Sequence, residues 1–448
     1  MDFILNSAES SIFFNASDSR EIEVQVEGEI PNDLVGTIYR VGPGLFSRGS
    51  EKKNNFIEGD GLVHSLTFGL DKKIRLKQRF VETEEFLLES KENRFLFRTI
   101  NSKAKPFYRN FGAQLKNLCN VNLLNINNQL LAFDEMQKPY KMDPDSLATL
   151  GESKWSQKVM AHYRYCPIAK KNYALSARFF PFTSVQVGEI IDADHVHFFE
   201  SIRLPSTAYI HDWFLTENFY VFVIPPVRFK SVATVKMLFG LGTHQNCLRF
   251  EPLEKTKIVA VLRSDTSKRY EIETEPFWFW HGLHAEDKKT KIKIHLISSP
   301  FGLDPGSSAP EPKCQLIKFS WNLKRNDLEK ESVYSTRLID FPCFSNRALL
   351  KKNFWMLSSD SDQSFNMLAY YNEEMTLIKE YRIEGETLMS PVLAETSGRS
   401  YLLVEAYNQY KKESSLYILN ADDEMNMQAK IKFSEPIPFS LHGIWQNE

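Results

Sequence analysis

Four histidines in similar surroundings are the side chains of this sequence best suited to chemistry. Each lies among aromatic or apolar residues, within or beside a strand-like pattern, and the four are His162, His211, His281 and His442. Imidazoles without cysteine thiolates suit iron, copper or zinc. The pattern therefore predicts one metal ion held by four imidazoles. A set of separate, hydrogen-bonded core histidines is the alternative that spacing alone leaves open.

A fold that unites such distant histidines must bring several strands to a common point. From about residue 21 onward the chain shows short strands broken by turn residues, among them Gly36 to Val41, Leu62 to Phe68 and Phe219 to Ile224. Many short strands with few helical patterns indicate an all-β protein. A β-propeller is the expected form, because it closes its sheets radially and brings their inner strands to one axis. A large double sandwich remains the alternative.

Two segments interrupt the strands and are expected to form helices, and the second shows helical spacing. The first is Phe107 to Leu118, and the second is Val227 to Leu241. One face of the second carries the apolar residues Val232, Val235, Leu238 and Phe239. Basic residues beside an apolar face are typical of a helix that lies on a membrane surface. A helix packed on the propeller face is the alternative.

Composition limits the classes of function. The 448 residues include 55 basic and 57 acidic ones, so the charge balance gives no case for nucleic acid. The five dispersed cysteines fit a reducing cytoplasm rather than a disulfide framework. The N-terminus lacks a signal-peptide pattern, and no apolar run is long enough to span a membrane. We expect one domain over residues 1–448, with about the first 20 residues extended, and a cytoplasmic, peripherally membrane-bound protein.

Three motifs around these histidines resemble the carotenoid cleavage oxygenase family. They are Glu58-Gly59-Asp60-Gly61-Leu62-Val63-His64, His211-Asp212-Trp213-Phe214-Leu215-Thr216-Glu217-Asn218 and Phe439-Ser440-Leu441-His442-Gly443. The resemblance runs in register from about residue 20 to the C-terminus. It implies a seven-bladed β-propeller with a helical or loop dome over the metal face. It also implies non-haem Fe(II) held by His162, His211, His281 and His442.

The same resemblance implies carboxylates that orient the ligand imidazoles. Glu135 and Glu386 match two of the three glutamates of the family, and Asp340 stands at the third position. Asp340 is one methylene shorter, so its hydrogen bond would need a water or a shifted strand. The family pattern places His281 rather than His284 as the ligand.

The reaction implied by the resemblance is the scission of a conjugated C=C bond by O2 into two carbonyl products. It needs no organic cofactor and no catalytic side chain beyond the metal centre. Stilbene-cleaving members carry a tyrosine on the strand after the Gly-Asp-Gly motif and a lysine before the first glutamate. Phe86 and Asp134 stand at those positions here, which favours an apolar carotenoid or apocarotenoid. The alternatives are a stilbenoid-cleaving enzyme, a retinoid isomerase or ester-cleaving relative, and a non-enzymatic propeller.

Overall fold

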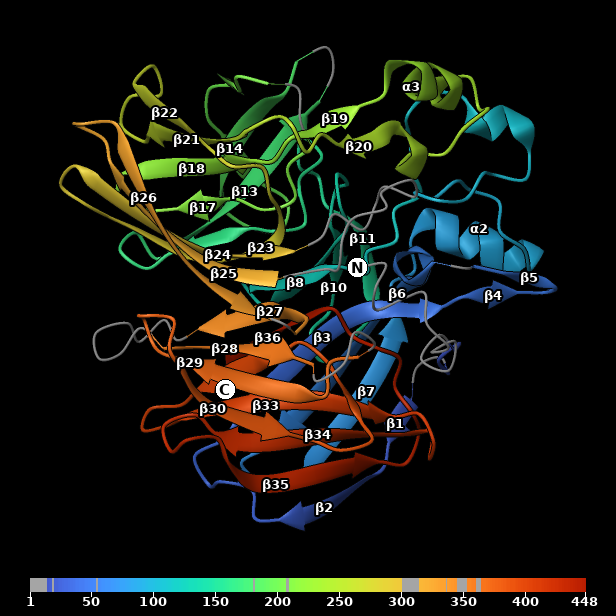
Figure 1. Ribbon diagram of the computed structural model, residues 1–448. Coiled ribbons are helices and arrows are strands. Elements are labelled where there is room, and N and C mark those ends of the chain that lie inside the picture. Colours follow the sequence, from blue (N-terminus) through green and yellow to red (C-terminus); the bar gives the residue numbers. More distant parts are fainter. Residues whose placement is uncertain are drawn as a thin grey trace.

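The computed structural model describes residues 14–17, 20–53, 55–179, 182–206, 209–299, 314–335, 337–344, 353–359 and 364–448. Seven separate antiparallel sheets of four to six strands form the blades of a β-propeller (Figure 1). The predicted all-β propeller is therefore confirmed, and the double sandwich is excluded. The predicted N-terminal extension falls mostly outside the described residues.

Both ends of the described chain take part in closing the ring. Blade 1 has the strand order β1 (Arg20–Ile22), β7 (Ile74–Phe80), β6 (Asp60–Phe68), β3 (Gly36–Leu45) and β36 (His442–Asn447). Blade 7 has the order β2 (Val24–Gly28), β35 (Asn426–Phe433), β34 (Glu413–Asn420), β33 (Ser400–Asn408) and β31 (Thr387–Leu388), with β32 (Val392–Glu395) also paired to β33. Each of these two blades thus combines strands from early and late in the sequence.

The other five blades follow in chain order. Blade 2 comprises β8 (Asn122–Ile126), β9 (Gln129–Phe133), β10 (Tyr140–Met142) and β11 (Thr149–Glu152); blade 3 comprises β12 (Arg164–Cys166), β13 (Lys171–Arg178), β14 (Ser184–Ile190), β15 (Val196–Phe198) and β16 (Ile202–Arg203). Blade 4 comprises β17 (Phe214–Leu215), β18 (Phe219–Ile224), β21 (Thr256–Leu262) and β22 (Arg269–Thr274); blade 5 comprises β23 (Trp278–Lys288), β24 (Lys291–Ser299), β25 (Cys314–Asn322) and β26 (Asp327–Ser335). Blade 6 comprises β27 (Ile339–Phe344), β28 (Phe354–Ser358), β29 (Met367–Tyr371) and β30 (Leu377–Arg382).

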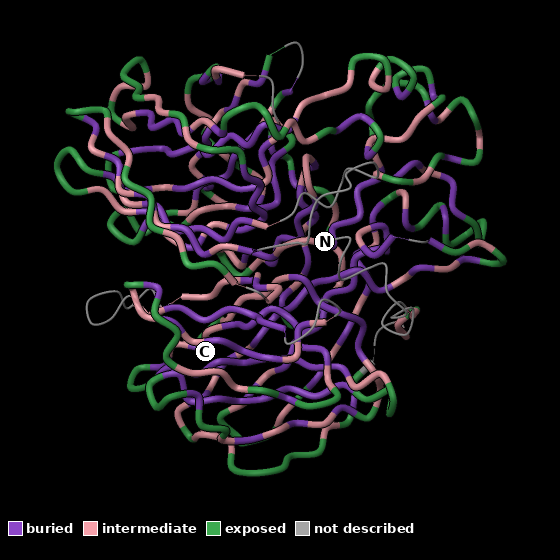
Figure 2. Tube along the Cα trace, in the orientation of Figure 1, coloured by how far each residue is buried: buried purple, intermediate pink, exposed green. Residues whose placement is uncertain are grey.

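The inner edge strands surround the axis of the propeller. Contacts run from β12 through β17, β23, β27 and β32 to β36, and from β36 to β8. The middle strands of the blades are buried on both faces, as in β18, where all six residues are buried. Apolar side chains of neighbouring blades form shared clusters, so burial is concentrated between the sheets while exposed residues lie at the rim (Figure 2).

The helices and two small hairpins lie together beside the sheets, on the right of Figure 1. They are α2 (Glu84–Glu92), α3 (Ser231–Leu238), the 3-10 turns η2 (Phe56–Glu58), η3 (Phe107–Asn110) and η4 (Gln245–Cys247), and the pairs β4–β5 (Ser47–Arg48, Glu51–Lys52) and β19–β20 (Val227–Phe229, Leu248–Phe250). Among the described residues no helix has the length and apolar character needed to cross a bilayer.

The two predicted helical segments are shorter than expected. In the segment 227–241 the first three residues pair with Leu248–Phe250 as a strand, so the helix begins only at Ser231. In the segment 107–118 only the turn Phe107–Asn110 is helical. The sequence located both interruptions of the strand pattern, but it could not show where strand pairing and loops would replace the expected helices.

Candidate metal centre

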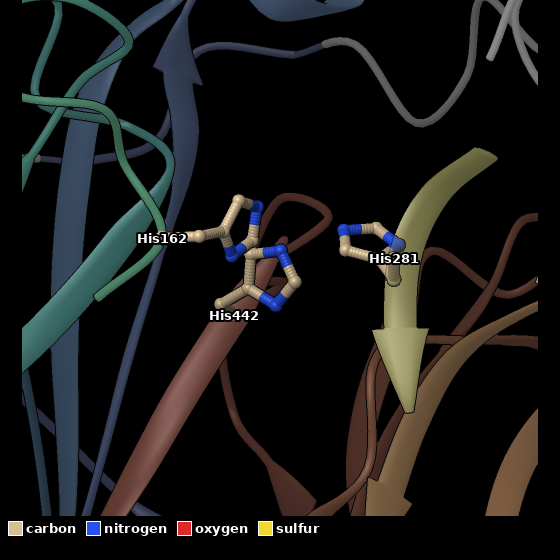
Figure 3. A group of neighbouring side chains, drawn as sticks. All are labelled: His162, His281 and His442. Atoms are coloured by element: carbon tan, nitrogen blue, oxygen red, sulfur yellow. The ribbon is translucent and has the colours of Figure 1, made fainter. Parts of the chain in front are cut away.

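The four predicted histidines come from four blades and meet at the inner edge strands. His162 and His211 lie shortly before β12 and β17, His281 lies within β23, and His442 opens β36. The side chains of His162, His281 and His442 converge in Figure 3. Nitrogen atoms of these three residues all lie within 4.8 Å of one another. Strand ends at a common axis therefore assemble a site from residues that are remote in sequence.

His211 joins the same group. Its Nε2 lies 3.1 Å from Nε2 of His162, and its ring centroid lies 5.7 Å from that of His281. Two nitrogens that bind one ion at about 2.1 Å are roughly 3 to 4 Å apart. His211 thus lies beside the group of three converging histidines, and a donor set of imidazoles fits iron, copper or zinc.

The environment favours neutral imidazoles at two of these positions. Burial, together with the charge of the neighbouring histidines, holds the pKa of His162 and of His442 well below the ordinary histidine value. Burial also opposes protonation of His211, but the carboxylates of Glu135, Asp212 and Asp340 together outweigh burial and raise the pKa of this residue. A metal ion binds the neutral form of imidazole, so the low pKa values suit ligation.

Two of the three predicted carboxylates contact a candidate ligand. Glu135 Oε1 accepts a hydrogen bond from His211 Nδ1 at 3.2 Å, and Asp340 Oδ1 accepts one from His281 Nδ1 at 2.7 Å. Glu135 also accepts from the backbone amide of Ala161, next to His162. Donation from Nδ1 leaves Nε2 as the free lone pair and fixes the plane of the ring. Both carboxylates therefore orient an imidazole towards the common centre.

Glu386 departs from the prediction. Its carboxylate accepts hydrogen bonds from Tyr417 Oη at 3.0 Å and from Lys430 Nζ at 2.9 Å, and no hydrogen bond to a histidine occurs among the described residues. The ammonium of Lys430 is a stronger partner for a carboxylate than a neutral imidazole. In this structure Glu386 therefore stabilises blade 7 rather than a candidate ligand.

Asp212 connects the backbones that carry three of the histidines. Its carboxylate accepts from the amides of Trp213 and Gly282 at 2.7 and 2.8 Å and is paired with the Arg164 guanidinium. The Trp213 indole in turn donates to the His162 carbonyl at 2.9 Å. Sequence reasoning assigned no role to Asp212, although its place in the His-Asp motif, directly after a candidate ligand, was a usable signal.

A second buried cluster of polar side chains lies beside the segment that carries His442. Glu405 accepts from His64 Nε2 at 2.6 Å and from Ser440 Oγ at 3.3 Å, and it pairs with Arg40 at 3.1 Å. Arg40 lies on β3 opposite Gly443, the residue after His442. His64 of the Gly-Asp-Gly motif therefore has structural contacts and is not in the group of converging nitrogens. A charge pair inside blades 1 and 7 thus fixes the segment that leads into β36.

The remaining sequence assignments have mixed outcomes. His284 pairs with His295 across β23 and β24 and is not in the group of converging nitrogens. Phe86 was expected on a strand, but it lies in α2, where Thr83 caps the helix by accepting from its amide. Asp134 is buried and accepts from the amides of Leu118 and Glu135, both at 2.7 Å. Burial raises the pKa of its carboxyl group to about 7.

Comparison with known proteins places this geometry in a family. The family model described as retinal pigment epithelial membrane protein matches residues 13–447. The chain is 25% identical to apocarotenoid-15,15'-oxygenase of Synechocystis sp. over 94% of this chain and 92% of that protein. It is also 25% identical to resveratrol cleavage oxygenase 1 of Aspergillus fumigatus over 94% and 92% of the two chains. Isoeugenol monooxygenase of Pseudomonas nitroreducens is 25% identical over 94% of each chain.

The fold has close counterparts among solved structures. A crystal structure of the cobalt-substituted Synechocystis apocarotenoid oxygenase superposes with a TM-score of 0.87, covering 98% of each chain at 23% identity. The curated relatives are oxygenases named for different substrates, so they share a class of reaction but not one substrate. The seven-bladed architecture and the matched family together confirm the resemblance drawn from the motifs. The chain belongs to the retinal pigment epithelial membrane protein family, which includes the carotenoid oxygenases.

Proposed function

We propose that the protein is an Fe(II)-dependent dioxygenase that cleaves a conjugated C=C bond of a carotenoid or apocarotenoid. Both atoms of O2 enter the products, one in each of two aldehydes or ketones, so the reaction balances without another electron donor. The observation that carries the proposal is the convergence of four imidazoles, two of them oriented by carboxylates.

The side chains around the histidines have three tasks. His162, His211, His281 and His442 would hold Fe(II), which supplies the redox chemistry that O2 requires. Glu135 and Asp340 keep two of the rings in place. Aromatic rings limit the access of water, since Trp280 lies 5.0 Å from His211 and Phe341 lies 5.2 Å from His281, measured between ring centroids. An apolar surround suits a hydrocarbon substrate.

The surroundings of Asp134 and Phe86 support an apolar substrate over a phenol. The Asp134 oxygens are engaged by two backbone amides, and the group carries no positive charge that could bind a phenolate. Phe86 stacks on Phe80, and the Arg48 guanidinium lies over its ring at 4.8 Å from the centroid. Neither residue offers the phenol-binding pair that the stilbene-cleaving resemblance requires.

A polyene is poorly soluble in water, so we propose that the protein takes its substrate from a membrane surface. The α3 patch consists of large apolar side chains that are all exposed: Phe107, Tyr108, Phe111, Val232, Val235, Leu238, Phe239 and Leu241. A β-bridge between Phe111 and Phe239 joins its two segments. Only Met237 of α3 is buried, so the helix turns most of its apolar surface outwards.

Basic residues beside the patch support the same proposal. Lys236 is exposed on α3 itself. Arg228, near the start of the same segment, is paired with Glu254 at 2.6 Å. Attraction to anionic lipid would therefore rest mainly on Lys236, and apolar insertion would supply the larger part of the binding. We further propose that residues 1–448 act as one domain, because strands from both ends close the same two blades.

Product analysis with labelled oxygen tests the proposal. The apoprotein is loaded with Fe(II) without air. Separate samples then receive ¹⁸O2 together with one substrate each: a carotenoid, an apocarotenoid, resveratrol or isoeugenol. We expect paired carbonyl fragments from one of the polyenes, with ¹⁸O in both at early times. Cleavage of resveratrol or isoeugenol alone would establish the phenolic alternative. Isomerised products without ¹⁸O would establish the isomerase, and iron-loaded protein inert towards all substrates would contradict the proposal.

A further inference from the structure

The backbone beside the candidate metal centre is strained at one aromatic residue. Phe341 has a φ of +54°, in the left-handed region that bulky residues rarely adopt. It also precedes Pro342, and a residue before proline favours extended backbone. Such strain persists only where the surrounding structure enforces it, and it is concentrated at functional sites. Phe341 therefore requires an explanation beyond strand geometry.

The strained residue forms a β-bulge directly after Asp340. Asp340 pairs with Leu357, but Cys343 pairs with Trp355, so β27 carries one residue more than β28 over this interval. A bulge redirects the side chains around it. Here Asp340 Oδ1 accepts from the Phe341 amide at 2.8 Å and from His281 Nδ1 at 2.7 Å. The shifted strand thus allows the short aspartate side chain to reach the imidazole directly.

The same bulge lays the Phe341 ring against two candidate ligands. Its centroid lies 5.2 Å from that of His281 and 5.7 Å from that of His442, and only 2% of the residue is exposed. Phe365 packs edge-on against it at 5.8 Å. The Phe341 ring itself thus restricts both imidazoles, whereas Asp340 restricts one of them through Nδ1.

We propose that Phe341 is a positioning residue of the metal centre, whose strained bulge presets both the Asp340 hydrogen bond and the spacing of His281 and His442. The inference rests on the proposed metal site. Phe341 would thus order two ligands before the metal binds. Preordered ligands lose less freedom on binding, so the metal is bound more tightly.

Metal binding by the apoprotein tests this role without any substrate. We compare Phe341→Leu with Phe365→Leu, which removes a ring from the same apolar cluster without touching a histidine. The probes are Fe(II) alone, titrated without air, and Co(II) alone, followed by its visible absorption. We expect Phe341→Leu to bind both ions about 10-fold more weakly or worse and to change the Co(II) spectrum. Phe365→Leu should lower the melting temperature but keep the wild-type affinity and spectrum.

Phe341→Gly provides a second comparison if the leucine variant does not fold. Glycine adopts a positive φ freely, so this change keeps the bulge and removes the ring. Weaker metal binding by Phe341→Gly than by Phe365→Leu supports the proposal. Equal binding by the Phe341 and Phe365 variants overturns it, even if wild-type protein binds iron. Failure of wild-type protein to bind either ion would instead refute the proposed metal site.

Discussion

The carboxylate of Asp212 accepts a hydrogen bond from the backbone amide of Gly282 at 2.8 Å, which links the segments that carry two candidate ligands. Asp212 directly follows His211 and Gly282 directly follows His281, so this contact restrains the distance between two candidate ligands from neighbouring blades. The spacing of the metal centre is therefore determined by backbone contacts as well as by the histidine side chains.

Replacing Asp212 by asparagine should weaken both the fold and the site. Asparagine has one acceptor oxygen where three donors now meet, so at least one donor loses its partner. We expect a loss of about 1.5–3 kcal/mol in the free energy of unfolding, measured with urea, together with reduced iron content. The matched control is Asp287→Asn on the same strand as Gly282, where the carboxylate is less buried and, within the described part of the chain, accepts hydrogen bonds from Asn218.

Alanine at His162, His211, His281 or His442 should remove most of the bound iron and the activity. Each change deletes one of four nitrogens, so the effect should exceed the roughly 10–100-fold expected for an orienting residue. Iron per protein, measured by elemental analysis, and product formation are the two readouts. The control is His284→Ala, which should retain iron because this side chain lies outside the converging group. Full iron content in any one of the four variants would remove that residue from the ligand set.

The three predicted carboxylates should differ in effect. Glu135→Gln and Asp340→Asn each disturb a contact to a ligand imidazole, and we expect iron affinity to fall about 10–100-fold. Glu386→Gln should leave iron affinity within about 3-fold of wild type, because its partners are Tyr417 and Lys430. Titration of the apoproteins with Fe(II) gives all three values. A loss at Glu386 equal to that at Glu135 would mean that the family position still acts on a ligand.

Asp134 should make stability depend on pH. Burial raises its pKa to about 7, whereas an aspartate in an unfolded chain titrates near 4. Because the folded state holds the proton more tightly, the stability from this group is complete below about pH 4 and is lost as the pH rises through about 7. In urea unfolding of the apoprotein, Asp134→Asn should gain up to about 4 kcal/mol relative to wild type between pH 4 and pH 8. The exposed control Asp145→Asn should follow the wild-type profile.

The α3 patch should control membrane binding. Val232→Glu combined with Val235→Glu places two charges on an exposed helical face and should abolish flotation with anionic liposomes. Activity on substrate in liposomes should fall, while activity on detergent-dispersed substrate should remain. The matched control is Val333→Glu with Tyr334→Glu on β26, where two apolar residues are also exposed. Equal flotation of both double variants would exclude the patch as the membrane contact.

Much of the architecture could be predicted because it depends on patterns that repeat along the chain. Runs such as Phe219 to Ile224 mark buried strands, and the structure contains that strand with the same bounds. The four histidines were identified from their apolar neighbours and their motifs, and the structure brings them together. Helix ends were less predictable, since Val227–Phe229 becomes a strand only through its pairing with β20.

The orienting contacts were harder to predict because they depend on local backbone geometry and on competing partners. Glu386 matches a motif, yet its contact with Lys430 could not be inferred from spacing. Asp340 reaches His281 through a bulge at Phe341. Its short side chain implied a water or a shifted strand, but the sequence could not show which of the two occurs. Spacing along a chain indicates which strand a residue occupies, but the direction of a side chain depends on one or two dihedral angles.

Closure of the ring by distant strands also has a kinetic consequence. Val24 pairs with Phe433 and Val41 pairs with His442, so the contacts that complete blades 1 and 7 join residues separated by about 400 positions. Contacts of such high contact order form late, because the entropy of closing a long loop must first be overcome. His442 lies on the closing strand itself. The complete set of four imidazoles therefore exists only after ring closure, and metal uptake would be a late step in maturation rather than a nucleus for folding.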